Sequence, residues 1–129
     1  MAIKLKPDYA DAHYNLGNAL FAERKIEEAI SHYKMAIKLK PDYAEVHYNL
    51  GNVLLNKGRT SEAISHYKMA IKLNPDYAEA YSNLGVVLFN AKMTEEAIDY
   101  FKEAIRIRPG YATAQKNLET ALLRSEELE

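Results

Sequence analysis

The sequence predicts an all-α fold of the solenoid class, because it repeats itself at a fixed interval. Its four prolines lie 34 residues apart throughout: Pro7, Pro41, Pro75 and Pro109. The nonapeptide MAIKLKPDY opens the chain and recurs at 35–43, and MAIKLNPDY is a further copy that differs at one residue. Between these copies, apolar residues recur at three- and four-residue steps, as on one face of a helix. A period of this length is typical of repeats that bury their apolar faces only against their neighbours.

Composition and charge exclude several classes of function. The 129 residues carry a net charge of -1, which gives no field that would favour nucleic acid or an anionic membrane. There is no cysteine, so disulfides and thiolate chemistry are absent. No apolar run reaches the ~20 residues of a membrane span, and the first residues lack the apolar core of a signal peptide. We expect a cytoplasmic protein with no nucleic-acid and no membrane partner.

The chain begins with half of a repeat. Residues 1–9 match the second helix of the later repeats and end in the proline that stops it, because proline lacks the N–H that a helix interior needs. Asp8 is then a helix cap, and apolar spacing predicts a helix over about 9–23. A break around 24–25 separates this helix from a second one over about 27–39.

This unit of helix, tight turn, helix and proline recurs without insertion. It occupies 10–43, 44–77 and 78–111, and 112–129 adds one further helix as a cap. In the second unit, Thr60 follows a Lys-Gly-Arg turn and is expected to cap the next helix. Aspartates after two of the prolines, each with glutamate three residues later, predict capping boxes: Asp42 with Glu45, and Asp76 with Glu79.

Residues at fixed places in the unit resemble the tetratricopeptide repeat. Each first helix contains leucine-glycine and then leucine, and each second helix contains alanine, an aromatic residue and alanine before the proline. The matching residues are Leu16, Gly17, Leu20, Ala29, Tyr33 and Ala36, then Leu50, Gly51, Leu54, Ala63, Tyr67 and Ala70, then Leu84, Gly85, Leu88, Ala97, Phe101 and Ala104. Histidine or tyrosine replaces the family's usual tryptophan. The resemblance implies a right-handed superhelical solenoid with a C-terminal capping helix.

The three first-helix glycines are expected to be packing positions. Glycine costs about 1 kcal/mol in a helix interior, and close approach of a second helix would offset that cost. The last helix departs from the pattern, since Glu119 stands where this glycine is expected. A charged outer face suits the end of a solenoid. We therefore expect the array to end there, the N-terminal end to be cut from a longer protein, and Leu128-Glu129 to be a cloning remnant.

Catalysis and cofactor binding find no support in the pattern. Ser31-His32 resembles a nucleophile and base, but neighbours on a helix diverge by about 100° and do not face each other. His13 with His32, and His47 with His66, are pairs within single repeats, and structural zinc needs four ligands. We predict no enzyme, no cofactor and no metal.

The first helices carry the candidate ligand-binding residues. The resemblance implies that the second, fifth, sixth, ninth, twelfth and thirteenth places of each repeat line a concave groove for peptides. Seven of these places hold asparagine, a poor helix former whose amide can both donate to and accept from a peptide backbone. The candidates are Asn15, Asn49, Asn83, Tyr14, Tyr48, Asn18, Asn52, Phe21, Phe89, Asn56, Asn90, Glu45 and Glu79.

Asparagine stands at the sixth place of every repeat, which resembles the asparagine ladder in the repeats of O-linked N-acetylglucosamine transferase. Such a row would hold an extended backbone, and the alternative that it bonds within the array stays open. Family members that bind the acidic C-terminus of heat-shock chaperones use a clamp of three cations and two asparagines. The matching residues are Tyr14, Asn18, Asn49, Glu79 and Asn83. The cations are missing and Glu79 would repel a carboxylate, so we predict a neutral or basic segment.

We predict a non-catalytic protein–protein interaction module that binds a protein or extended peptide in the concave groove. Two alternatives stay open: a self-assembly module, and the substrate-selecting repeat region of a larger enzyme such as a glycosyltransferase. We also expect a homodimer through the N-terminal end. There Ile3 and Leu5, with Leu16 and Leu20 behind them, lack the cover of a preceding helix, and burying such side chains contributes about 1.5–3 kcal/mol each.

Overall fold

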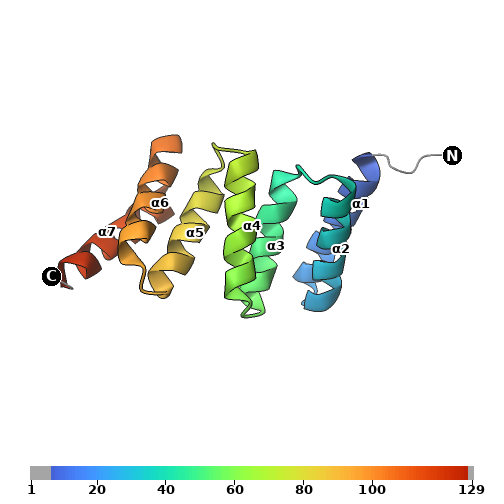
Figure 1. Ribbon diagram of the computed structural model, residues 1–129, viewed down its shortest axis with the longest axis horizontal. Helices are drawn as coiled ribbons and strands as arrows, with labels where there is room; N and C mark the ends of the chain where they lie inside the picture. Colours follow the sequence, from blue (N-terminus) through green and yellow to red (C-terminus); the bar gives the residue numbers. More distant parts are fainter. Residues whose placement is uncertain (1–6, 128–129) are drawn as a thin grey trace. The chain divides into compact units, whose positions relative to one another are not determined.

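The computed structural model describes residues 7–127, which form seven α-helices and no strand (Figure 1). The helices are α1 (Pro7–Ala22), α2 (Ile26–Leu39), α3 (Ala44–Asn56), α4 (Thr60–Leu73), α5 (Ala78–Asn90), α6 (Thr94–Ile107) and α7 (Ala112–Glu127). The predicted all-α class is confirmed. Ile3 and Leu5, on which the dimer prediction depends, and the last two residues lie outside the described residues. None of the described helices is both long and apolar enough to cross a membrane.

The chain divides into two compact units, Met1–Leu73 and Asn74–Glu129. In unit 1, α1 packs against α2, α3 packs against α4, and α2 also contacts α3. In unit 2, α5 packs against α6, and α7 packs mainly against α6. Consecutive helices therefore form pairs, as helix-turn-helix repeats require.

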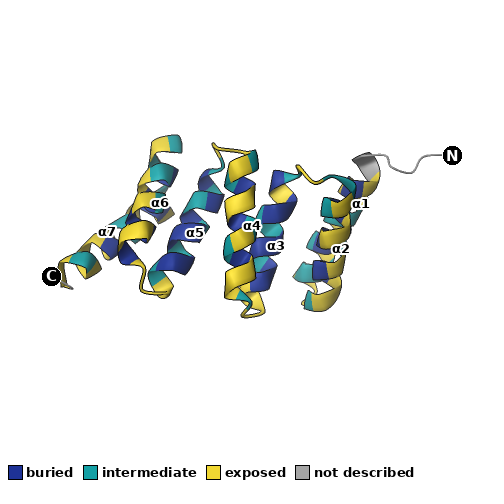
Figure 2. Cartoon of the chain, in the orientation of Figure 1, coloured by how far each residue is buried: buried dark blue, intermediate teal, exposed yellow. Residues whose placement is uncertain are grey.

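Small side chains and one aromatic ring fill the space within each helix pair. Ala29, Ala63 and Ala97 have no exposed surface, and the rings of Tyr33 and Tyr67 are 1% exposed or less. Phe101 is the equivalent ring of the third repeat. Figure 2 shows the other side of these second helices, where the surface of α4 is largely exposed. Alanine at these places lets the two helices of a repeat approach closely.

Each first-helix glycine lies against the aromatic ring of its own repeat. A Cβ atom added to Gly51 would lie 2.8 Å from Cε1 of Tyr67. At Gly17 the nearest ring atoms, of Tyr33, would be 2.7 Å away. At Gly85 the closest atom, Cε1 of Phe101, would be 2.6 Å away. The predicted close approach is therefore present, and a side chain from the second helix makes it.

The turn inside each repeat passes through a left-handed residue. The φ angles are 66° at Arg24, 83° at Gly58 and 69° at Lys92. The next backbone N–H then returns to the end of the first helix, as in the 2.8 Å bond from Arg59 to the Leu54 carbonyl. This arrangement satisfies carbonyls that a helix C-terminus leaves unpaired. Only the second repeat uses glycine here, although glycine adopts this conformation most readily.

The predicted capping residues are wrong at four positions. Asp8 is the second residue of α1, which begins at Pro7. Helix α3 begins two residues after Asp42, and the residue at the cap position, Tyr43, makes no side-chain cap bond. Helix α5 begins in the same way after Asp76. A turn that includes Pro41 is closed by a bond from the Tyr43 N–H to the Lys40 carbonyl oxygen. The helix therefore begins later in the chain than predicted. Thr60 is the first residue of α4 and not its cap.

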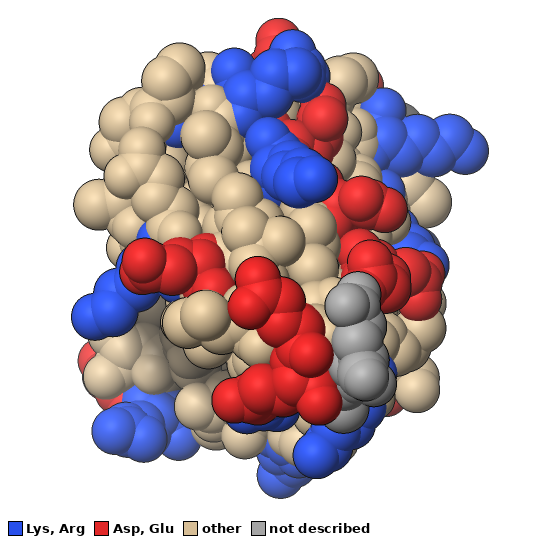
Figure 3. Space-filling model, turned by 90° about the vertical axis from the view of Figure 1, so that its left-hand side faces the viewer, with Lys and Arg blue, Asp and Glu red and all other residues tan. Residues whose placement is uncertain are grey.

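The outward surface of α7 combines charged and aliphatic groups. Glu119 is exposed, as its position in the pattern predicted. Leu122 and Leu123 are also exposed, by 42% and 57%. Figure 3 looks onto this end of unit 2, where both signs of charge lie among uncharged surface. The surface is thus less uniformly polar than the sequence suggested.

Candidate functional site

The candidate residues lie on the first helix of each repeat, and none of them belongs to the buried core. We call their surface the candidate face of α1 and α3 in unit 1, and of α5 in unit 2. Its exposed members are Asn15, Glu45, Asn56 and Asn90. Its half-buried members are Tyr14, Asn18, Phe21, Tyr48, Asn49, Asn52, Glu79, Asn83 and Phe89. All of these side chains therefore have some surface that a partner can contact.

A hydrogen bond links the candidate face of α3 to that of α1. The amide nitrogen of Asn49 donates to the hydroxyl oxygen of Tyr14, 2.7 Å away. This bond fixes the plane of the amide, and with it the direction of its carbonyl oxygen. The sequence placed both residues on one surface but did not indicate that they bond to each other.

The ninth-place asparagines of unit 1 are partnered inside their own repeats. The hydroxyl of Tyr33 donates to Oδ1 of Asn18, and that of Tyr67 donates to Oδ1 of Asn52, both at 2.5 Å. Burial raises the pKa of Tyr33 to about 12, so this hydroxyl keeps its proton at neutral pH. These amide oxygens therefore serve the fold, a role that the sequence analysis did not assign.

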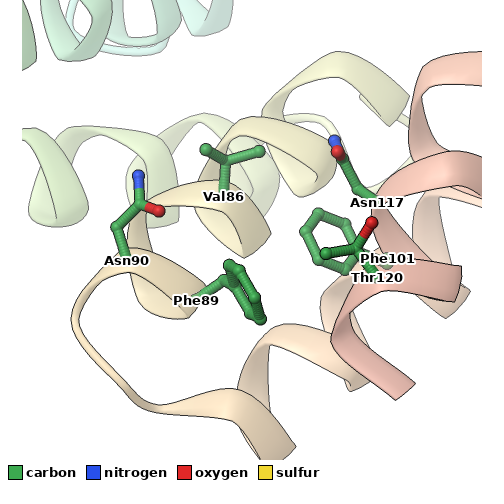
Figure 4. Close-up of a pocket in the computed structure, with 6 residues that line it drawn as sticks. All are labelled: Val86, Phe89, Asn90, Phe101, Asn117 and Thr120. Atoms are coloured by element: carbon green, nitrogen blue, oxygen red, sulfur yellow. The ribbon is translucent and has the colours of Figure 1, made fainter. Parts of the chain in front are cut away.

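The third repeat replaces both members of this pair with apolar residues. Val86 stands at the asparagine place and Phe101 at the tyrosine place. Beside them is a cavity of about 200 Å³ lined by Val86, Phe89, Asn90, Phe101, Asn117 and Thr120. Figure 4 shows the apolar side chains from α5 and α6 around one space, with Asn117 and Thr120 reaching it from α7. The cavity belongs entirely to unit 2.

The charge of Glu79 is compensated by a neighbour. The guanidinium of Arg108 lies 2.7 Å from its carboxylate. Glu79 therefore repels an acidic ligand less than the sequence suggested. The prediction against acidic C-termini now depends on the missing clamp cations.

The two histidine pairs of unit 1 have the same geometry. Nδ1 of His13 lies 3.0 Å from Nδ1 of His32, and the same distance separates His47 from His66. In both pairs the rings stack with centroids 5.2 Å apart. Tyr81 and Tyr100 occupy the equivalent places in unit 2, with ring centroids 6.2 Å apart. The recurrence indicates a packing role.

The proton positions in the second pair follow from its partners. Nε2 of His47 lies 3.2 Å from the carbonyl oxygen of Pro41. That oxygen can only accept, so Nε2–H donates to it and Nδ1 of neutral His47 accepts from Nδ1–H of His66. Burial lowers the pKa of His47. Burial, and then the nearby His47, lower the pKa of His66 to about 4.

Among the described residues, these histidines have no further side chains beside them that would complete a metal site. Among residues 7–127, no group of three or more histidine, cysteine, aspartate or glutamate side chains is placed to hold an ion. In the His47–His66 pair, two neutral imidazoles joined by one shared proton account for the contact.

Comparisons with known proteins identify the repeat family of this fold. The family model described as "TPR repeat" matches residues 1–24, 17–58 and 51–91, and the model "Tetratricopeptide repeat" matches 78–111. A search of curated protein sequences found no significant match.

Several solved structures are similar. The first TPR of Spaghetti (RPAP3), bound to the HSP90 peptide SRMEEVD, is 23% identical, with a TM-score of 0.90 over 97% of this chain and 99% of that one. The Sgt2 TPR domain from Aspergillus fumigatus is 22% identical, with a TM-score of 0.87 over 99% of this chain and 87% of that one. MamA is 32% identical, with a TM-score of 0.77 over 83% of this chain and 63% of that one. The matched repeats and the shared helix-pair fold show that this chain belongs to the tetratricopeptide repeat family.

Proposed function

We propose that the chain is a non-catalytic protein–protein interaction module that binds an extended peptide segment on its candidate faces. The carrying observation is that thirteen polar or aromatic side chains at the family's ligand places are all at least partly exposed. The structural relative from Spaghetti holds a peptide, which supports this class of ligand.

The Asn49 amide is oriented in a way that suits contact with a peptide backbone. Its nitrogen is bonded to Tyr14, which leaves its carbonyl oxygen as the acceptor for a backbone N–H of the ligand. An amide that is already oriented loses less side-chain freedom on binding than a mobile one. Backbone recognition of this kind places few demands on the sequence of the partner.

Replacing Asn49 with alanine should weaken peptide binding while leaving the fold intact. We expect affinity to fall about tenfold, because one hydrogen bond is lost and a ligand N–H is left unpaired. The free energy of unfolding should change by less than about 1 kcal/mol, since alanine is the better helix former. Fluorescence polarisation with peptides enriched from a phage-displayed library of random twelve-residue peptides measures the first quantity, and urea unfolding the second.

Tyr14→Phe is the matched control for that change. It keeps the ring and removes only the hydroxyl that orients the Asn49 amide. We expect a smaller loss of affinity than for Asn49→Ala. If Asn49→Ala melts much lower than the parent chain but binds the enriched peptides normally, the amide is structural and the proposed backbone contact is wrong.

The absence of clamp cations predicts which charge the ligand carries. The peptide SRMEEVD with its free carboxylate should bind no more tightly than its amidated counterpart SRMQQVN, which keeps the arginine and lacks the acidic groups. Acidic side chains and a terminal carboxylate gain affinity only where cations meet them, and Tyr14, Glu79 and Asn83 supply none. Isothermal titration of both peptides makes the comparison.

A gain-of-function variant gives the converse test. Glu79→Lys with Asn83→Arg places cations at the two clamp positions of unit 2. This variant should prefer SRMEEVD over SRMQQVN by tenfold or more at low salt, since each new charge pair adds to the attraction. Preferential binding of SRMEEVD by the unaltered chain would refute the prediction of a neutral or basic ligand.

A further inference from the structure

We infer that the cavity of unit 2 is a subsite that receives one apolar side chain, such as leucine, methionine or phenylalanine, from the bound segment. The inference rests on the proposed function and adds a specificity to it. Backbone contacts by asparagines would hold many sequences. A pocket for one side chain would select among them.

The size of the cavity fits a single side chain. Its volume is about 200 Å³. Sites for whole small molecules usually start at about 300 Å³, whereas an apolar cavity of about 150 Å³ accommodates benzene. A phenylalanine ring or an aliphatic side chain of similar size therefore fits, and a larger free ligand does not.

The chemistry of the lining favours a hydrocarbon. Val86, Phe89 and Phe101 contribute apolar surface, and Phe101 is only 1% exposed. The guanidinium of Arg124 lies 5.3 Å from the centre of the Phe89 ring. The hydroxyl of Thr120 donates to the Lys116 carbonyl oxygen at 3.1 Å, so its proton is already engaged.

The polar members of the lining suit the peptide on either side of that side chain. Asn90 is on α5 and Asn117 is on α7, so amides flank the apolar surface from two helices. Each amide can donate to a backbone carbonyl or accept from a backbone N–H. None of the six lining residues carries a charge, so neither an anion nor a cation finds a counter-charge within the lining.

A paired sequence change accounts for the apolar character of this site. In unit 1 the corresponding places hold a tyrosine hydroxyl bonded to an asparagine oxygen, in both repeats. Changing one partner alone would leave a partly buried polar group unpaired, which is costly. In unit 2 both partners are apolar, Phe101 and Val86. The pair is therefore exchanged as a unit, and the exchange leaves hydrocarbon facing the cavity.

Amino-acid amides test the pocket directly on the full chain. N-acetyl-leucinamide, with N-acetyl-asparaginamide as its polar counterpart, would be titrated while ¹H–¹⁵N and methyl spectra are recorded. We expect the leucine compound to shift the signals of Val86, Phe89 and Thr120 with a dissociation constant in the millimolar range, as a ligand of about twelve heavy atoms allows. The asparagine compound should bind at least fivefold more weakly.

Two variants should abolish this binding. Val86→Asn with Phe101→Tyr installs the polar pair that unit 1 already contains, and Thr120→Leu fills the cavity from an exposed position on α7. Thr113→Leu, on an exposed part of the same helix, is the control and should bind as the parent chain does. Circular dichroism identifies any variant that has lost its fold. If one of the two cavity variants is unfolded, the other one tests whether leucine binding requires the cavity.

The outcome separates this inference from the proposed function. Equal shifts from the leucine and asparagine compounds, or leucine binding that survives in a folded variant of either kind, would overturn the pocket. If leucine binds as expected but no library peptide is enriched, the pocket stands and the peptide-binding function fails. The enriched peptides could instead share no apolar residue whose contribution to affinity is lost in the Thr120→Leu variant. In that case peptide binding stands and the subsite is wrong.

Discussion

Replacing Gly51 with leucine is expected to lower the free energy of unfolding by about 3 kcal/mol or more. Leucine is the better helix former by close to 1 kcal/mol, so helix propensity alone predicts the opposite sign. The packing decides, because a Cβ at this position would lie 2.8 Å from the Tyr67 ring. That ring is fully buried and its hydroxyl is bonded to Asn52, so it cannot move away without losing this bond. Urea unfolding followed by circular dichroism measures the change.

Gly110→Leu is the matched control. No atom lies within 4 Å of a Cβ at Gly110, so its unfolding free energy should stay within about 0.5 kcal/mol of the parent value. The free energy of unfolding of Gly51→Ala should lie between those of the two leucine variants. A Gly51→Leu protein that melts at or above the parent temperature would contradict the placement of Gly51 against Tyr67.

Acidification should destabilise unit 1 through His47 and His66. The pKa of His66 is about 4 in the folded chain, against 6.5 for an unperturbed histidine, and the pKa of His47 is also lowered. The unfolded chain therefore binds more protons than the folded one between these values. Stability is fully present above about pH 6.5 and is lost as the pH falls towards 4. The loss through His66 should stay below the ~3 kcal/mol that a shift of this size gives for a fully buried group, because His66 is partly exposed and solvent screens its charge.

The charged neighbours of His66 act in both directions. His47 and Lys34 lower its pKa, and Glu62 raises it. The control is His47→Tyr with His66→Tyr, which copies the pair at Tyr81 and Tyr100. Urea unfolding at pH 7.5 and pH 5.0 should show a markedly smaller loss for this variant than for the parent chain. An equal loss in both proteins would assign the acid sensitivity to other groups.

The repeat period and the helical spacing were sufficient to predict the all-α class and the helix pairs. They depend on which residues are apolar or small, and such patterns are visible in one dimension. The starts of α3 and α5 were predicted wrongly, because aspartate before a helix also occurs in a turn. A backbone bond from Tyr43 closes that turn, and no residue type in the sequence identifies such a bond.

The residues of the candidate face could be predicted from their positions in the repeat, but the hydrogen bonds among them could not be predicted. Asn18 and Asn49 are both half-buried on first helices, yet Asn18 bonds to Tyr33 in its own repeat and Asn49 bonds to Tyr14 in the previous one. The exchange of tyrosine and asparagine for Phe101 and Val86 was present in the sequence. Its meaning depends on the distance between the two side chains, which only the fold supplies.

The most direct test of peptide binding on the candidate faces is a map of where a bound peptide perturbs the chain. The ligands would be the peptides enriched from the twelve-residue library, and the readout the ¹⁵N chemical shifts of side-chain and backbone amides. We predict the largest shifts at asparagines of the first helices, among them Asn15, Asn49 and Asn90. Shifts confined to the exposed second-helix surface around Lys34, Lys68 and Lys102 would contradict the account.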